Sequence, residues 1–151
     1  NRLEIAKKIG ADLTINAREK DPVKEVLSLT DSFGVDRVIE TVGTAAGIEN
    51  RDMPIEQAVR MARHGGRIVV MGMGSQFTPV FWKTFVEKEI QLVGSRVTLG
   101  DFPRALNLMS QGRFHPDLLI SKECALEKTG EAFRLLEKEP DRYLKFLIKV
   151  V

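Results

Sequence analysis

The 151-residue sequence is poor in the side chains that most often bind metals or form covalent cross-links. It has one cysteine, Cys124, and two histidines, His64 and His115. A single cysteine cannot form a disulfide within the chain, which favours a reducing, cytoplasmic setting. Zinc sites need clustered Cys, His or carboxylate ligands, and one cysteine with two separated histidines does not supply them. We therefore predict structural roles for these three residues, and neither a metal site nor catalytic residues in this chain.

A strong excess of charge is also absent. The chain has 23 basic and 21 acidic residues and a formal net charge of +2. This balance gives no support for a nucleic-acid or anionic-membrane partner. No apolar run approaches the roughly 20 residues that span a bilayer, and the first residues do not resemble a signal peptide. The sequence begins with Asn1 rather than methionine, so we expect it to be a piece of a longer protein.

Two short apolar runs that end in glycine are the most informative feature present. They cover residues 34–43 and 65–72, and both are rich in β-branched residues. Runs of this length are typical of buried parallel strands. Between them, Ile55, Ala58 and Val59 recur at helical spacing, and Gly65 follows as a stop signal. The pattern predicts a βαβ unit, and ligands of such sheets bind beyond the carboxyl ends of the strands.

Strand and helix patterns alternate through the rest of the chain, which predicts an α/β fold with a parallel sheet and helices on both faces. Further strands are predicted at residues 12–16, 90–94 and 146–151, with an extended piece at 118–121. Helices are predicted at residues 3–9, after Asp21, after Asp101 and at 126–137. Residues 79–82 read as an edge strand followed by a helical turn, and residues 45–52 read as a loop.

Three features near the strand ends leave two interpretations open. Residues 72–77 resemble a G-x-G-x-x-G motif without its last glycine, and are either a phosphate-binding turn or a strand-end turn. Glu40 is either a site residue or a polar residue that ends a strand. Arg96, two residues after Gly94, contacts either a phosphate or carboxamide group or only solvent.

The aromatic residues between these strands also have two interpretations. Phe77, Phe81, Trp82 and Phe85 lie within nine residues of one another. They form either part of the core or a subunit interface, because aromatic side chains are enriched at interfaces and an edge strand can pair across a two-fold axis.

Taken in order, these segments resemble the nucleotide-binding domain of medium-chain, zinc-dependent alcohol and polyol dehydrogenases. The resemblance covers essentially the whole chain and rests on residues 2–12, 34–43, 65–72, 88–95, 101–106, 131–133 and 145–151. It implies a Rossmann-like, doubly wound parallel sheet that is incomplete because the first βαβ unit is missing. It also implies that residues 1–151 are a single truncated dinucleotide-binding domain without the catalytic zinc domain.

The resemblance also implies which residues contact the cofactor. Arg2 resembles the basic residue that contacts the adenosine ribose, and the others resemble the strand-end segments on either side of the nicotinamide ring. The implied cofactor-binding residues are Arg2, Thr41, Val42, Met71, Gly72, Met73, Val93, Gly94, Ser95 and Arg96.

The implied function is that of an oxidoreductase fragment. The parent enzyme would transfer hydride between an alcohol and NAD or NADP, with zinc only in the missing catalytic domain, and the fragment alone would be inactive. The segment from Phe77 to Trp82 resembles an edge strand that forms a dimer or larger homo-oligomer. A non-catalytic binding or oligomerisation module is the alternative. A methyltransferase is a third idea, but it needs an acidic residue where this chain has Gly94, Ser95 and Arg96.

Overall fold

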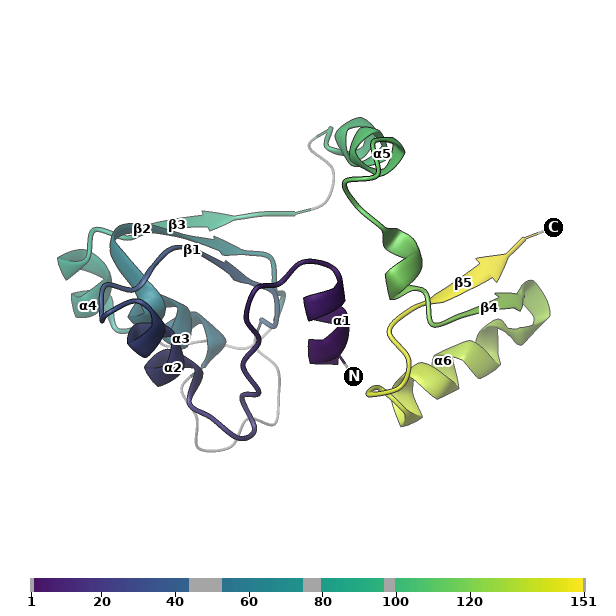
Figure 1. The fold of residues 1–151 in the computed structure, drawn as a ribbon, viewed down its shortest axis with the longest axis horizontal. Helices are drawn as coiled ribbons and strands as arrows, with labels where there is room; N and C mark the ends of the chain where they lie inside the picture. The colour runs from purple at the N-terminus through teal and green to yellow at the C-terminus, as the bar shows by residue number, and fades with distance from the viewer. Residues whose placement is uncertain (1, 44–52, 75–79, 97–99, 151) are drawn as a thin grey trace. The chain divides into compact units, whose positions relative to one another are not determined.

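The computed structural model describes residues 2–43, 53–74, 80–96 and 100–150 (Figure 1). The chain divides into two compact units, one of residues 16–99 and one of residues 1–15 with 100–151. The prediction that all residues form one domain stays a prediction, and each unit is described by itself. Within the described residues, no helix is both long enough and apolar enough to cross a membrane.

The unit of residues 16–99 contains a three-stranded parallel sheet with the strand order β1-β2-β3. Its elements are α2 (Pro22–Leu29), β1 (Val35–Glu40), α3 (Pro54–Met61), β2 (Ala62–Val70), α4 (Trp82–Glu87) and β3 (Gln91–Gly94). The α3 helix packs against β1 and β2, and α2 and α4 contact α3 on the same side (Figure 1). The predicted βαβ unit and the parallel direction of the three strands are therefore confirmed.

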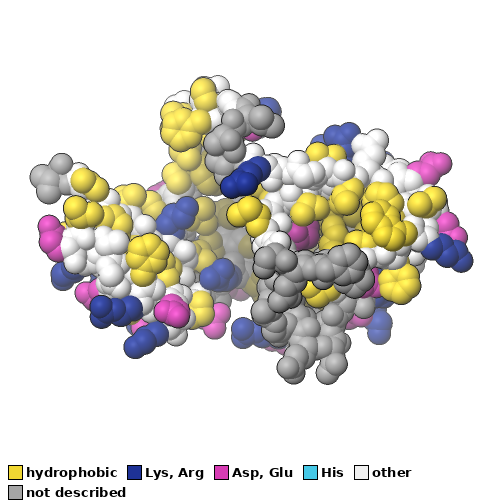
Figure 2. All heavy atoms as spheres, turned by 180° about the vertical axis from the view of Figure 1, so that it is seen from behind, with side chains coloured by type: hydrophobic (Ala, Val, Ile, Leu, Met, Phe, Trp, Pro, Cys, Tyr) yellow, Lys and Arg dark blue, Asp and Glu magenta, His cyan; other side chains and the backbone are white. Residues whose placement is uncertain are grey.

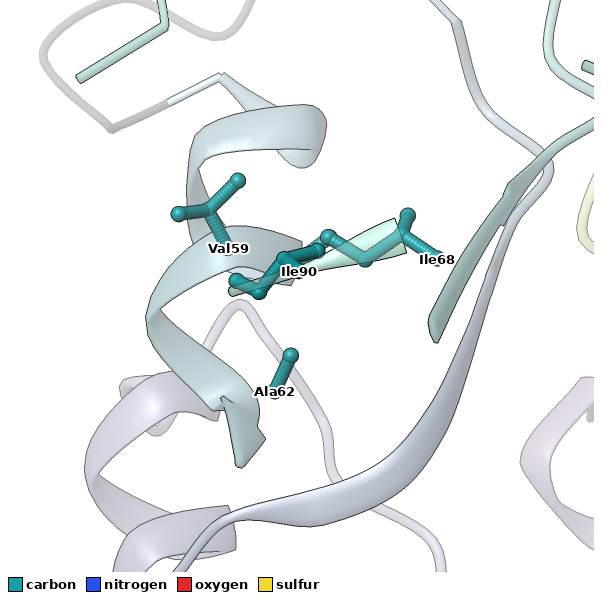
Figure 3. Close-up of a cluster of buried hydrophobic side chains, with 5 residues drawn as sticks. Val59, Ala62, Ile68 and Ile90 are labelled. Atoms are coloured by element: carbon teal, nitrogen blue, oxygen red, sulfur yellow. The ribbon is translucent and has the colours of Figure 1, made fainter. Parts of the chain in front are cut away.

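The core of this unit lies between α3 and the sheet. Ala58 and Val59 of α3 are buried against Ile68 of β2 and against Ile90, which immediately precedes β3. Figure 3 shows the side chains of Ile68 and Ile90 meeting beside α3, which carries Val59, with Ala62 below them. The helical spacing of the apolar residues in α3 puts them on the sheet-facing side, as the sequence indicates.

The start of α2 follows directly from the sequence. The Asp21 carboxylate accepts hydrogen bonds from the backbone N–H groups of Val23 (2.9 Å) and Lys24 (3.2 Å), and Pro22 occupies the first turn. These contacts satisfy amide groups that have no partner inside the helix. Val23 is then buried as the first apolar residue of the helix.

A lysine from the end of α4 terminates α3. The Lys88 Nζ donates to the carbonyl oxygens of Val59 (3.2 Å), Arg60 (2.8 Å) and Ala62 (2.8 Å). A cation at this position satisfies the free carbonyls and suits the helix dipole. The sequence predicts that Gly65 ends α3, and this is wrong. The helix ends at Met61, and β2 already includes Gly65.

The second unit contains a two-stranded parallel sheet of β4 and β5. Its elements are α1 (Arg2–Lys8), α5 (Phe102–Ser110), η1 (Pro116–Leu119), β4 (Lys122–Ala125), η2 (Leu126–Lys128), α6 (Thr129–Lys138) and β5 (Phe146–Lys149). Ala132 of α6 is buried, and Cys124 of β4 is half-buried. Three large apolar side chains of α5, those of Phe102, Leu106 and Met109, are exposed.

Three further sequence predictions differ from the structure. Residues 12–16 form no strand, because an extended segment becomes a strand only when its backbone pairs with another. The segment at 118–121 begins in the 3₁₀ helix η1, which Pro116 at its first turn favours. Trp82 begins α4 rather than ending an edge strand, and its ring makes an edge-to-face contact with Phe85 at 5.4 Å. The predicted loop at 45–52 and residues 77–79 lie outside the described residues.

Replacing Lys88 tests the termination of α3. We expect Lys88→Met to lower the free energy of unfolding by about 1–2 kcal/mol, because three carbonyl groups lose a common donor. Lys83→Met, at an exposed lysine of α4, is the matched control and should change it by less than about 0.5 kcal/mol. Urea denaturation of the three proteins measures both values, and equal effects of the two substitutions would contradict the assigned role.

The pH dependence of the free energy of unfolding gives a second test of the role of Lys88. Burial, followed by the nearby Arg60 charge, lowers the pKa of Lys88 below its ordinary value of 10.5. The unfolded chain therefore holds this proton more tightly than the folded chain does. The stability of the unchanged protein should rise relative to that of Lys88→Met as the pH increases from the folded-state pKa to 10.5.

Candidate functional site

The carboxyl ends of β1, β2 and β3 meet at one edge of the sheet. Glu40 pairs with Val70, and Val70 pairs with Gly94, so the three strands end in register. The backbone N–H groups of Met71 (2.8 Å) and Gly72 (3.0 Å) both donate to the carbonyl oxygen of Glu40. The three strand-end segments predicted to face a ligand therefore lie side by side.

The Glu40 side chain organises the turn that follows β1. Its carboxylate is buried, with 6% of the residue exposed. The Oε1 atom accepts hydrogen bonds from the N–H groups of Val42 (2.6 Å) and Gly43 (2.7 Å). Two amide donors offset part of the cost of burying a carboxylate. Of the two interpretations of Glu40, the hydrogen bonds show a polar residue that ends a strand, and a role in a ligand site stays a prediction.

Two glycines allow the turns after β1 and β2 to touch. A Cβ atom on Gly72 would lie 2.1 Å from the Gly43 nitrogen and 2.7 Å from the Glu40 Oε2. Gly43 has a φ of +71°, and a Cβ atom there would lie 2.5 Å from the carbonyl oxygen of Met73. Contact between the two turns therefore requires both glycines. The sequence indicates only that bare backbone at these glycines is open to a ligand.

Gly94, at the end of β3, has different surroundings. A Cβ atom at Gly94 would have no heavy atom within 4 Å. Beyond it, the Ser95 N–H donates to the carbonyl oxygen of Val70 (2.9 Å), which keeps the chain beside β2 for one more residue. Open space at Gly94 leaves the backbone of β3 accessible from outside.

A small cavity lies beside these strand ends. Its volume is about 260 Å³, and its lining includes Glu40, Gly72, Ile55 and Leu92. Of the residues predicted to contact a cofactor, only Gly72 lines it. Sequence reasoning missed the other apolar walls, although signals for them exist. Ile55 begins the apolar stripe of α3, and Leu92 pairs with the core residue Ile68.

The predicted cofactor contacts separate into two groups. Nine of the ten end or follow the strands of the first unit, and they are Thr41, Val42, Met71, Gly72, Met73, Val93, Gly94, Ser95 and Arg96. Arg2 belongs to the other unit, where its Nε (3.3 Å) and Nη2 (3.0 Å) donate to the Pro140 carbonyl oxygen. The structure brings the nine together at one edge, while contact of any of the ten with a cofactor stays a prediction.

Metal-binding side chains do not gather in the part of the chain that the structure describes. There, no group of three or more His, Cys, Asp or Glu residues could hold a metal ion. His64 lies in β2, His115 precedes η1 and Cys124 lies in β4.

Comparison with known proteins identifies several relatives. The sequence model of the zinc-binding dehydrogenase family matches residues 1–111. An alcohol dehydrogenase of Cupriavidus necator is 31% identical over 153 aligned residues, which cover 99% of this chain and 40% of the relative. D-arabitol-phosphate dehydrogenase of Enterococcus avium is 30% identical over 135 residues, which cover 88% of this chain and 36% of the relative.

Comparison with solved structures also finds dehydrogenases. The 2R,3R-butanediol dehydrogenase of Bacillus subtilis superposes with a TM-score of 0.84 at 26% identity, covering 99% of this chain and 41% of that enzyme. An Escherichia coli CFT073 alcohol dehydrogenase solved with NADH superposes with a TM-score of 0.82 at 26% identity, covering 98% and 41%. The chain therefore spans about 40% of the length of these relatives.

Alanine substitutions at two strand-end glycines test the contact between the turns. We expect Gly72→Ala to lower the free energy of unfolding by about 3 kcal/mol or more, because the added methyl group clashes with backbone atoms that cannot move independently. Gly94→Ala is the matched control, and the open space there should limit its effect to about 0.5 kcal/mol. Thermal and urea unfolding measure the difference, and a well-tolerated Gly72→Ala would show that the turns do not touch.

Proposed function

Because this chain belongs to the zinc-binding dehydrogenase family, we propose that it is the nicotinamide-cofactor-binding part of an NAD(P)-dependent alcohol or polyol dehydrogenase. The single observation that carries the proposal is the shared edge at which β1, β2 and β3 end in register. In parallel sheets, ligands bind at this edge. Nine of the ten proposed cofactor contacts belong to it.

The side chains at this edge suit a flat, largely apolar ring with a polar substituent. Val42, Met71 and Met73 are 54%, 52% and 76% exposed, although all three are hydrophobic. A nicotinamide ring that lies on such side chains would remove them from water. The neighbouring backbone at Gly72 and Gly94 would offer hydrogen bonds to the carboxamide group.

In this proposal the chain positions a cofactor rather than performing the bond-breaking chemistry. When bound, the nicotinamide ring accepts or donates the hydride. Thr41, Val42 and residues 71–73 would form one wall of its pocket, and residues 93–96 the other. Arg2 would contact the adenosine ribose.

The described residues do not fit a zinc site, because no suitable cluster of ligands occurs among them. We therefore assign the zinc of the family to a part of the protein outside this chain, and assign no zinc-dependent step to any residue here. The cytoplasmic location inferred from the cysteine content likewise stays a prediction.

An oligomerisation role is the second candidate, because one end of the first unit exposes large apolar residues. Phe81, Trp82 and Val86 are 66%, 62% and 67% exposed. Hydrophobic side chains are also exposed at several places on the face shown in Figure 2. Exposed apolar patches often mark subunit interfaces. The contact between copies would then use the start of α4 rather than an edge strand that includes Trp82.

An NADH titration followed by NMR tests the cofactor-binding role. We expect backbone shifts at residues 41–43, 71–73 and 93–96, because the ring would lie between these segments. Gly94→Val should keep the fold, since its side chain enters open space, yet weaken binding about tenfold or more by filling the cofactor's place. Gly130→Val is the matched control, because its Cβ also has no neighbour within 4 Å.

Two results of this titration would contradict the proposal. One is the absence of shifts at the strand ends, and the other is equal NADH affinity for the Gly94→Val and Gly130→Val proteins. Sedimentation of the same samples tests the second candidate. A stable dimer that binds no NADH would favour the oligomerisation role.

The chain alone should be catalytically inactive. We expect no NADH formation from NAD with ethanol, sorbitol or 2,3-butanediol, because the residues assigned here bind and orient a cofactor but do not activate an alcohol. The absorbance of NADH measures this directly. Turnover that co-purifies with the chain and is lost in Gly94→Val would show that the catalytic groups lie within it.

A further inference from the structure

The opposite edge of the same sheet carries an arginine-lined pocket that the proposed function does not use. It has a volume of about 720 Å³ and lies at the amino ends of the strands. Its lining includes Arg37 of β1, Arg63 and Arg67 of β2, and Gln91 of β3. We propose that this pocket binds a small polyanion of the phosphate type, held by Arg37 and Arg67, which form no ion pair among the described residues.

The charges in the pocket do not cancel. Three guanidinium groups line it, together with one carboxylate, that of Asp36. The Arg63 Nε donates to the Asp36 Oδ1 at 2.5 Å, and the Arg63 Nη1 donates to the His64 carbonyl oxygen at 2.6 Å. Arg63 thus occupies the only carboxylate among the described residues that line the pocket. The positive charges of Arg37 and Arg67 remain uncompensated there.

Arg67 is held in place by a neutral partner. Its Nε and Nη2 donate to the Gln91 Oε1 at 2.9 and 2.7 Å. The amide oxygen fixes the orientation of the guanidinium group without neutralising it. A guanidinium group oriented in this way can bind an anion with little further loss of side-chain freedom. Arg37, for its part, has neither a hydrogen bond nor an ion pair in the described ranges.

The register of the sheet places Arg37 and Arg67 directly opposite each other. Arg37 of β1 pairs with Arg67 of β2, and Arg67 pairs with Gln91 of β3. Paired positions on neighbouring strands put their side chains on the same face, where like charges repel. An anion between the two guanidinium groups would convert this repulsion into two attractions.

The geometry favours a small phosphate-type anion over an acidic protein segment. Guanidinium groups bind phosphate oxygens through paired, charge-assisted hydrogen bonds. The pocket volume is within the range of small-ligand sites, which is roughly 300–1,000 Å³. Arg37 of β1 and Arg67 of β2 occupy paired positions, so a ligand with two phosphates can contact both arginines. Inorganic pyrophosphate is the simplest such ligand.

A pyrophosphate titration at low ionic strength, followed by NMR of backbone amides and arginine Nε–Hε groups, tests this proposal. We expect shifts at Arg37, Arg67 and Gln91, and a loss of affinity as salt is added. Arg37→Gln and Arg67→Gln should each weaken binding about tenfold, which corresponds to about 1.4 kcal/mol. Arg104→Gln, at an exposed arginine of α5 that does not line the pocket, should leave the affinity unchanged.

Stability measurements distinguish this role from a structural one. Without pyrophosphate, Arg37→Gln should unfold at the same or a higher temperature than the unchanged protein, because the substitution removes a repulsive pair. With pyrophosphate, the unchanged protein should gain stability and the variant should not. A variant that is destabilised without the anion would show that Arg37 serves the fold.

Two further outcomes would overturn the proposal. The first is the absence of shifts at the arginines, as expected if the pocket accepts only an acidic protein segment. The second is binding that Arg37→Gln and Arg104→Gln weaken equally, as expected for general surface charge. ADP in place of pyrophosphate separates a nucleotide from a free anion, because only a nucleotide site gains affinity from the adenosine group. The outcomes of the pyrophosphate and ADP titrations do not depend on whether NADH binds at the carboxyl edge of the sheet.

Discussion

The hydrogen bonds of Glu40 hold together the edge of the sheet at which the proposed cofactor site lies. Its backbone oxygen accepts from the first two residues after β2, while its buried side chain accepts from the turn after β1. One residue thus sets the position of both turns. These hydrogen bonds bring Gly43 and Gly72 so close that neither position has room for a side chain. The exposed apolar side chains of Val42, Met71 and Met73 belong to these two turns, so the same hydrogen bonds fix their positions.

The two edges of the sheet differ in the chemistry of their side chains. At the carboxyl edge, turns without bulky side chains meet beside a small cavity, and the neighbouring apolar residues face solvent. At the amino edge, a wider pocket is lined by guanidinium groups whose charges are only partly compensated. Polar groups therefore dominate one edge and apolar groups the other. This contrast is consistent with a ring-shaped ligand at the first edge and a compact anion at the second.

The sequence predicts the elements whose signals are local, and fails where a distant residue decides. Short β-branched runs indicate β1, β2 and β3, and Asp21 with Pro22 marks the start of α2. The end of α3 depends instead on Lys88, which is 26 residues beyond Ala62 and gives no local signal. Strand-like composition at residues 12–16 is likewise insufficient, because a strand also needs a pairing partner.

The candidate cofactor site likewise combines features that the sequence predicts with features that depend on residues distant in the chain. That the three strands end at one edge is predictable from their parallel direction, and nine of the ten proposed contacts lie there. The apolar stripe of α3 indicates that Ile55 faces the sheet, but the pairing of Ile55 with Leu92 in one cavity wall depends on the position of α3 along the sheet, for which the sequence has no local signal. The bonding of Glu40 depends on turn geometry, and the sequence leaves its role open between two interpretations.

The position of Lys88 also has a consequence for how the first unit opens. Its ammonium group holds the last turn of α3, while its carbonyl oxygen accepts the N–H of Gly65 in β2 at 2.7 Å. Ile90, two residues later, enters the core beside Val59. Local unfolding of the short segment between α4 and β3 would therefore break the contacts of Lys88 with the end of α3 and with β2, and would remove Ile90 from the core at the same time. Amide hydrogens in α3 and β2 should consequently exchange with solvent as one cooperative group rather than fraying separately.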